Sequence, residues 1–331
     1  MTRRMRPALI SVALGLAALA LGVLSLFIGY APIPPEAVIA GLLGEGDTAS
    51  IVVREIRLPR ALLALMIGAG LGASGAALQG LLRNPLAEPG VIGISAAAGL
   101  GAVGAMYFGL ASLWPWALPA IAMLAAAAAT VVILLVSWRG GTLSLILAGV
   151  ALSSICAALT SLALNLSPNA YAASEIIYWL LGSLKDRSMA DAALAAPFVG
   201  LGGLLIFSQR KALDVLALGE ETAVSLGVDL RALSVVLVLG VAMAAGASVA
   251  AAGAIGFIGL VVPHIMRPIV GHAPLALMLP SALGGACLLL AADMCVRVIP
   301  TSSELMVGVL TALLGAPFFL WLVLRHRRAW A

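Results

Sequence analysis

The residue types that most often carry catalysis or metal binding are few and scattered in this sequence. The three histidines make no ligand spacing and stand at His264, His272 and His326. The three cysteines lie in apolar segments without a CxxC pair, which is typical of packing residues, at Cys156, Cys287 and Cys295. Neither lysine, Lys185 or Lys211, belongs to a GxxxxGK[ST] phosphate-binding loop. The sequence therefore predicts no catalytic residue, no metal site and no ATP hydrolysis by this chain.

Arginines are the residues with the clearest binding chemistry. Arg54, Arg57 and Arg60 stand just before the second long apolar stretch. Guanidinium groups pair with carboxylates in a bidentate way, so these arginines could receive acidic side chains of a partner protein. Equally, the side chains could anchor the chain by reaching lipid headgroups. The sequence by itself favours neither interpretation.

A second candidate lies in the ninth apolar stretch, where Asp293 and Arg297 are four residues apart. Residues with this spacing share one face of a helix and can form an ion pair. Ionisable groups are costly within a membrane, so they usually face a cavity or the interior of a helix bundle. A purely structural pair and a functional pair both remain open.

Two polar loops also carry information. The loop from Arg83 to Gly90 holds two prolines and a glycine, which predicts a stiff turn that either connects helices or narrows a pathway. In the longer loop, a short helix is predicted from Leu218 to Leu226, with Glu220 and Glu221 in its first turn and a stop at Gly227. Its acids favour a protein partner over an amphipathic helix on anionic lipid.

The elements that must position these residues are membrane helices. The chain has 331 residues, of which 63% are hydrophobic and 10% charged, with a mean hydropathy of +1.16. A soluble domain would carry about a quarter charged residues. We therefore predict an all-α polytopic membrane protein, a single domain over residues 1–331, with about ten transmembrane helices. The expected spans are 8–30, 60–81, 92–110, 117–137, 143–166, 191–207, 232–252, 256–270, 275–296 and 305–324.

The first span and the orientation follow from the same pattern. A signal peptide is the alternative for the N-terminus, but the run 8–30 is too long for its apolar region and no clean cleavage site follows. With ten spans and a cytoplasmic N-terminus, twelve of the eighteen Lys and Arg residues lie inside. The six outside are Arg54, Arg57, Arg60, Lys185, Arg187 and Arg297. Both termini are therefore expected in the cytoplasm.

Six motifs in order along the chain resemble a known family. They are Arg57-Leu-Pro-Arg60, Gly75-Ala-Ala-Leu-Gln-Gly80, Asn84-Pro-Leu-Ala-Glu-Pro-Gly90, Leu218-Gly-Glu, Gly256-Phe-Ile-Gly-Leu-Val-Val-Pro-His264 and Gly315-Ala-Pro-Phe318. They are similar to motifs of the FecCD-type permeases, which belong to ABC importers for siderophores, haem and cobalamin. The resemblance runs from about residue 30 to 325.

The resemblance implies partners and site residues. A second permease copy, two cytoplasmic ATPase subunits that bind ATP and Mg, and a periplasmic substrate-binding protein are expected in the bacterial inner membrane, with no nucleic acid. By position, Arg57 and Arg297 match the arginines that dock the binding protein. The coupling segment, about 214–230, includes Leu218, Gly219, Glu220, Glu221, Leu226 and Gly227. The cytoplasmic gates match Asn84 and Leu86 on one side and Thr142 and Leu143 on the other.

The expected function is translocation of an iron chelate, siderophore or haem, by alternating access. Cobalamin is the alternative substrate within the same family. An ion-gradient transporter would need ionisable or broken-helix sites near the membrane midplane, where this chain carries almost no charge. A membrane enzyme would need clustered His, Asp or Glu. Both are distant alternatives.

Overall fold

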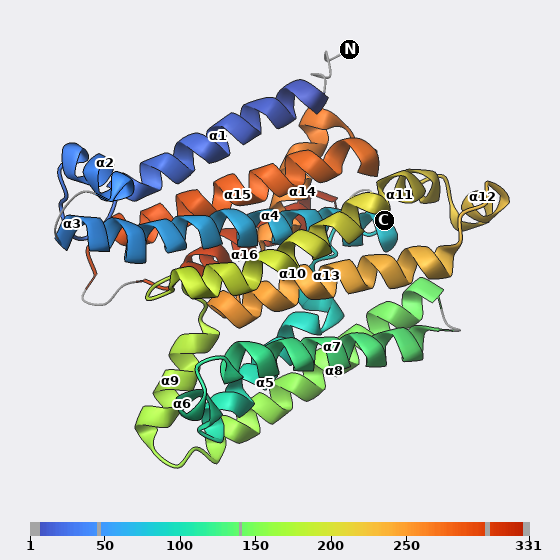
Figure 1. Ribbon diagram of the computed structural model, residues 1–331. Coiled ribbons are helices and arrows are strands. Elements are labelled where there is room, and N and C mark those ends of the chain that lie inside the picture. The colour runs from blue at the N-terminus through green and yellow to red at the C-terminus, as the bar shows by residue number, and fades with distance from the viewer. Residues whose placement is uncertain (1–6, 45–47, 139–140, 302–304, 327–331) are drawn as a thin grey trace.

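The computed structural model describes residues 7–44, 48–138, 141–301 and 305–326, and this part of the chain is a bundle of helices without strands (Figure 1). A helix occupies each of the ten predicted spans, which confirms the all-α polytopic prediction. These helices are α1 (Pro7–Phe27), α4 (Leu58–Leu81), α5 (Ile94–Tyr107), α7 (Ala117–Ser137), α8 (Gly141–Asn165), α10 (Met189–Ser208), α13 (Leu230–Ala252), α14 (Ile258–Val270), α15 (Pro274–Val298) and α16 (Val307–His326).

The spans differ in length. Within the described residues, seven helices are long and apolar enough to cross a membrane, while α5, α14 and α16 are shorter apolar helices there. The 13 residues of α14 rise only about 20 Å, less than the roughly 30 Å core of a bilayer. The predicted eighth span is therefore present but short, and the chain leading into it, 253–257, is not helical.

Several short helices lie outside the spans, and of these only α12 (Glu220–Ser225) was predicted. Between the first two spans lie α2 (Pro35–Leu43), α3 (Thr48–Ile51) and a π-helical stretch, η1 (Val52–Arg57), which runs directly into α4. The remaining short elements are η2 (Pro89–Ile92), α6 (Leu110–Leu113), α9 (Ala170–Leu180), α11 (Arg210–Leu216) and α12 (Glu220–Ser225). Each is too short to stand out in a hydropathy pattern.

Local signals explain where several helices begin. The Asn169 side chain accepts the Ala172 N–H at 2.9 Å at the start of α9, and Ser188 and Asp191 form a reciprocal capping box at the start of α10. At the start of α13, Asp229 accepts two backbone N–H groups. These caps satisfy N–H groups that have no partner within the helix.

The bundle is built around α4 and α13. In the most apolar stretch of each, 78% of the residues are buried, whereas in α1 and α8 only 17% are. Helix α4 packs on α15, α10, α13 and α14. Figure 1 shows α11 and α12 projecting at one end, which is also where α1 begins. Helices α2 and α3 lie at the opposite end. We call these the α12 end and the α2 end.

Glycines allow the central helices to touch. A Cβ atom at Gly75 of α4 would overlap the Gly259 carbonyl of α14, and one at Gly68 would overlap the Gly285 carbonyl of α15. Small residues allow this backbone approach in membranes. These glycines therefore serve helix packing. For the cysteines the packing prediction holds for buried Cys156 but is wrong for Cys295, which faces outward.

Candidate functional site

A buried ionic cluster lies at the α2 end of the bundle. Asp293 of α15 accepts a hydrogen bond from Arg60 Nε at 2.8 Å and from a terminal nitrogen of Arg297 at 2.7 Å. The Asp293 side chain has no exposed surface, and the side chains of Arg60 and Arg297 are 7% and 3% exposed. The predicted pair of Asp293 and Arg297 is confirmed, and Arg60 joins it across helices.

Arg297 of this cluster and Arg57 hold the chain at the C-terminal end of α1. Arg297 donates to the carbonyl oxygens of Ser25 and Ile28 at 2.9 and 2.8 Å, and Arg57 donates to those of Leu26 and Ala31 at 2.8 and 2.6 Å. The last carbonyls of a helix have no partner within it, and cations there also meet the negative end of the helix dipole. Arg57 and Arg297 thus tie α1 to α4 and α15.

The three arginines before the second span therefore have different surroundings. Arg57 and Arg60 are buried, so the alternative of headgroup anchoring is wrong for both. Arg54 is exposed and donates to the Leu42 carbonyl at 3.2 Å, at the end of α2. Docking of a partner through Arg57 and Arg297 stays a prediction, and the structure adds that both guanidinium groups already hold backbone carbonyls.

At the opposite end stands the predicted coupling helix. It begins at Glu220 rather than Leu218, because Gly219 adopts a positive φ of 113° in front of it. At its end, the Gly227 N–H bonds to the Val224 carbonyl and the Val228 N–H to the Ala223 carbonyl, both at 2.9 Å. This is a Schellman termination, and Gly227 supplies its left-handed residue, which confirms the predicted stop.

Apolar side chains of α12 and of the residues that flank it are exposed. Leu218, Val224 and Leu226 are 67%, 57% and 62% exposed. Ala223 on the opposite side is fully buried and packs into the core beneath. Glu220 pairs with Arg83 at 3.0 Å, and so connects α12 to the loop after α4. The helix is therefore held from below while an apolar surface remains open outside.

The loop after α4 is stiff, as predicted. The Asn84 side chain accepts the Leu86 N–H at 2.9 Å, which closes an Asx turn, and Arg83 has a positive φ of 47°. Glu88 then accepts the backbone N–H of Phe257 at 3.2 Å, at the start of α14. Burial raises the pKa of the Glu88 carboxyl, and the Phe257 N–H opposes that rise. This contact joins two loops far apart in sequence.

Phe257 is unusual because it has a φ of 68° although it is not glycine. Its ring lies where a Cβ atom of Gly315 would be, so α16 needs glycine at that position. Bulky residues seldom adopt this conformation without surrounding contacts that impose it. Here the contacts are Glu88 on the backbone and α16 on the ring.

Further contacts bring the sequence motifs into one region. Gln79 of α4 donates to the Gly259 carbonyl at 3.2 Å and accepts a hydrogen bond from Arg267 of α14. His264 meets Phe318 edge-to-face, with ring centroids 5.6 Å apart, which makes it a packing residue. The motifs at 75–80, 84–90, 256–264 and 315–318 therefore share one packing region around α14.

The gate predictions can be placed only in part. Asn84 and Leu86 lie half-buried in the stiff loop, and Leu143 is 67% exposed in the first turn of α8. The side chain of Thr142 lies outside the described residues. The loop meets α8 further along, because Gly149 lies directly against the backbone of Ile92. The gating roles stay predictions.

Sequence reasoning missed the contacts of Arg60, Glu88 and Phe257: it named Arg60 as a candidate partner contact, not as the partner of Asp293. A signal existed for Glu88 and Phe257, which lie in two of the family motifs, but nothing in the sequence indicated that they meet. For Arg60, the available signal was Asp293, the single acidic residue of the ninth predicted span, which needs a cationic partner. Among the described residues no group of three or more His, Cys, Asp or Glu could hold a metal ion.

The fold and these features define a polytopic helical membrane protein with a buried ionic cluster at one end and an exposed short helix at the other. Residues 17–325 match the FecCD transport family, and the chain belongs to that family. It is a permease subunit of an ABC importer rather than an enzyme.

Relatives with this role are similar over most of the chain. The chain is 40% identical to the hemin transport system permease protein HmuU of Yersinia pestis, over 82% of this chain and 83% of the relative. It is 41% identical to the vitamin B12 import system permease protein BtuC of Citrobacter koseri, over 84% of each. It is 38% identical to the Fe(3+)-citrate import system permease protein YfmE of Bacillus subtilis, over 97% and 96%.

A solved structure shares the fold. It comes from a metal-chelate type ABC transporter in an inward-facing conformation, and it superposes with a TM-score of 0.84 at 31% identity. The match covers 96% of this chain and 99% of the other.

Proposed function

We propose that this chain is one half of a permease dimer that moves an iron chelate, either haem or an iron–siderophore complex, across the bacterial inner membrane. An ATPase partner supplies the energy, and the substrate crosses without chemical change. Two named relatives carry haem or ferric citrate, which supports iron, and one carries vitamin B12, which keeps cobalamin as the alternative.

The observation that carries the proposal is the form of α12. A short capped helix stands outside the bundle, with exposed Leu218, Val224 and Leu226 on its outer side. An apolar surface on a helix that is fixed from below suits a groove in a second protein. The Arg83–Glu220 pair extends this contact to the stiff loop, so a push on α12 would reach Glu88 and α14.

We further propose that the pathway forms between two copies of the chain, with both termini and α12 in the cytoplasm. Support comes from the family resemblance and from α8, where apolar residues such as Leu143, Leu147 and Ile155 face outward. The residues proposed as gates, Asn84 and Leu86 with Thr142 and Leu143, lie at the α12 end of this helix or in the adjacent loop.

At the opposite end we propose docking of a binding protein that presents carboxylates. Arg57 and Arg297 can take part only if a carboxylate replaces the α1 carbonyls that they now hold, whereas exposed Arg54 needs no such exchange. Charge reversal separates the two routes. Both substitutions also disturb the buried cluster and should lower thermal stability, so loss of binding-protein affinity in Arg57→Glu with Arg297→Glu supports docking through these two only where the variant still binds the ATPase at the α12 end. Unchanged affinity in that double variant rules it out.

The function is tested in proteoliposomes that contain the permease and its ATPase, supplied with loaded binding protein. We expect uptake of the iron chelate that needs ATP and stops with vanadate. Cobalamin, haem and a ferric siderophore are offered in parallel, and the preferred one identifies the substrate. Uptake that is driven by a proton gradient without the ATPase would refute the proposal.

A further inference from the structure

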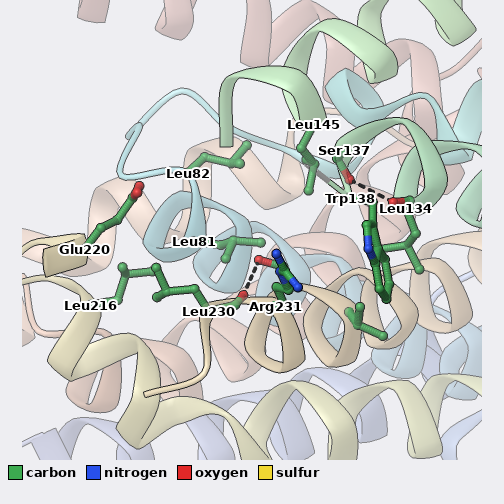
Figure 2. A pocket seen from close by; sticks show the side chains of 12 residues that line it. Leu81, Leu82, Leu134, Ser137, Trp138, Leu145, Leu216, Glu220, Leu230 and Arg231 are labelled. Atoms are coloured by element: carbon green, nitrogen blue, oxygen red, sulfur yellow. Dashed lines mark hydrogen bonds between the residues drawn. The ribbon is translucent and has the colours of Figure 1, made fainter. Parts of the chain in front are cut away.

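A cavity opens at the α12 end of the bundle, between the ends of several spanning helices (Figure 2). It holds about 210 Å³ and is lined by the ends of α4 and α7, the starts of α8 and α13, and residues of α11 and α12. It is distinct from the exposed outer side of α12, because the cavity lies between that helix and the bundle.

The cavity has an apolar part and a cationic part. Leu81 and Leu145, both buried, and Leu134 supply leucine side chains to its wall. Arg231 lies between Leu81 and Trp138 in Figure 2, with its guanidinium carbon 6.0 Å from the centroid of the Trp138 ring. The cavity is therefore amphipathic and has its positive charge at one position.

Among the residues that the structure describes, the guanidinium of Arg231 has no acidic side chain paired with it, since the nearby acid Asp229 caps the start of α13 through the backbone N–H groups of Arg231 and Ala232. Glu220, the acid in the cavity wall, is held by Arg83 at 3.0 Å. No ion pair of Arg231 occurs within the described parts of the chain. The hydroxyls of Ser137 and Ser234 are neutral and donate to carbonyls of their own helices, so they leave the charge of Arg231 uncompensated. An anion is the ligand that this wall complements.

The depth of the cavity along the membrane helices indicates which kind of anion it would bind. Helix α7 ends at Ser137 and α13 begins at Leu230, so this cavity lies at the depth where apolar spans give way to polar chain. Trp is enriched at headgroup level, Arg side chains extend toward it, and basic pockets between membrane helices bind anionic headgroups. A soluble anion would use Arg231 but leave the leucines without a contact.

We propose that this cavity binds an anionic phospholipid, with its phosphate at Arg231 and Trp138 and the start of an acyl chain along Leu81, Leu134 and Leu145. The lipid would fill the space between the bundle and the α11–α12 segment, and so support the position of α12. The proposal needs only that the chain spans a membrane, and it stands or falls independently of the transported substrate.

Native mass spectrometry of the purified full chain tests this, with phosphatidylglycerol and phosphatidylcholine titrated as probes. We expect phosphatidylglycerol to bind at least fivefold more tightly. Arg231→Gln should weaken phosphatidylglycerol binding about fivefold, because a basic residue near the membrane surface contributes about 1 kcal/mol to the binding of anionic lipid. Ser234→Phe, which fills the cavity without changing charge, should also weaken it. Arg210→Gln, an exposed arginine of α11 outside the cavity, is the matched control and should not.

Several results would overturn the proposal. Equal loss of binding in Arg210→Gln would show a diffuse charge effect, and equal affinity for phosphatidylcholine would remove the role of the cation. Binding of soluble glycerophosphoglycerol as tight as that of the lipid would show a free-anion site. Displacement of the lipid by the ATPase subunit would assign the cavity to an acidic protein segment. A melting temperature for each variant confirms that it is folded.

Discussion

The buried cluster at the α2 end gives the sharpest test of the structure. Asp293→Asn removes the negative charge but keeps the shape of the side chain. Two buried arginines, Arg60 and Arg297, then face an amide instead of a carboxylate. We expect a large loss of stability, because the two buried guanidinium groups lose their counter-charge and no water can solvate them in its place.

The contacts set the magnitude. Asp293 accepts hydrogen bonds from two guanidinium groups, at 2.8 and 2.7 Å, and bonds to charged groups contribute about 1.5–3 kcal/mol each. Breaking a buried ion pair by removing one partner costs about 3–5 kcal/mol. Arg297 keeps its bonds to the Ser25 and Ile28 carbonyls, which limits the loss. We therefore expect the free energy of unfolding to fall by about 3 kcal/mol.

Equilibrium unfolding in mixed detergent micelles, followed by circular dichroism, measures this change. Glu220→Gln is the matched control, because it breaks the Arg83–Glu220 pair, whose side chains are 48% and 44% exposed. An exposed pair contributes at most about 1 kcal/mol. If the free energy of unfolding of Asp293→Asn stays within about 1 kcal/mol of the wild-type value, the ion pairs of Asp293 do not stabilise the fold as argued.

Three further predictions concern packing, coupling and the loop contact. Gly75→Ala should lower the free energy of unfolding by about 1–3 kcal/mol, because the new methyl meets the Gly259 carbonyl; the same micelle assay measures it. Leu226→Asp should weaken the complex with the ATPase at least tenfold, read from its dissociation constant, because a charge replaces an exposed apolar contact. Glu88→Ala should cost about 1 kcal/mol in unfolding and slow ATP-driven uptake, since the N–H before α14 loses its acceptor.

Each has its own control. Gly15→Ala should leave stability within about 0.5 kcal/mol or raise it slightly, since no atom lies within 4 Å of the added Cβ. Lys211→Ala, on α11, should keep ATPase affinity near the wild-type value if the contact is the apolar surface of α12. Glu88→Gln retains an oxygen acceptor, so it should restore most of the stability. A Gln variant as damaged as the Ala variant would contradict the hydrogen-bond explanation.

Much of the fold was determined by the sequence alone. The ten spans could be placed because a membrane helix is a local feature, a run of apolar residues of fixed length. The stop of α12 could be predicted for the same reason, since Gly227 acts within one helical turn, whereas its start lies two residues later than predicted. The ion pair of Asp293 and Arg297 followed from a spacing of four residues.

The tertiary structure decided which of these residues meet across the chain. Arg60 joins Asp293, and Glu88 joins Phe257, over 233 and 169 residues of separation. Such contacts depend on the order in which helices pack, and in a membrane every span is apolar, so hydropathy does not say which face meets which neighbour. Only packing showed that Arg57 and Arg297, which the family resemblance implied dock a partner, are both buried and hold the end of α1.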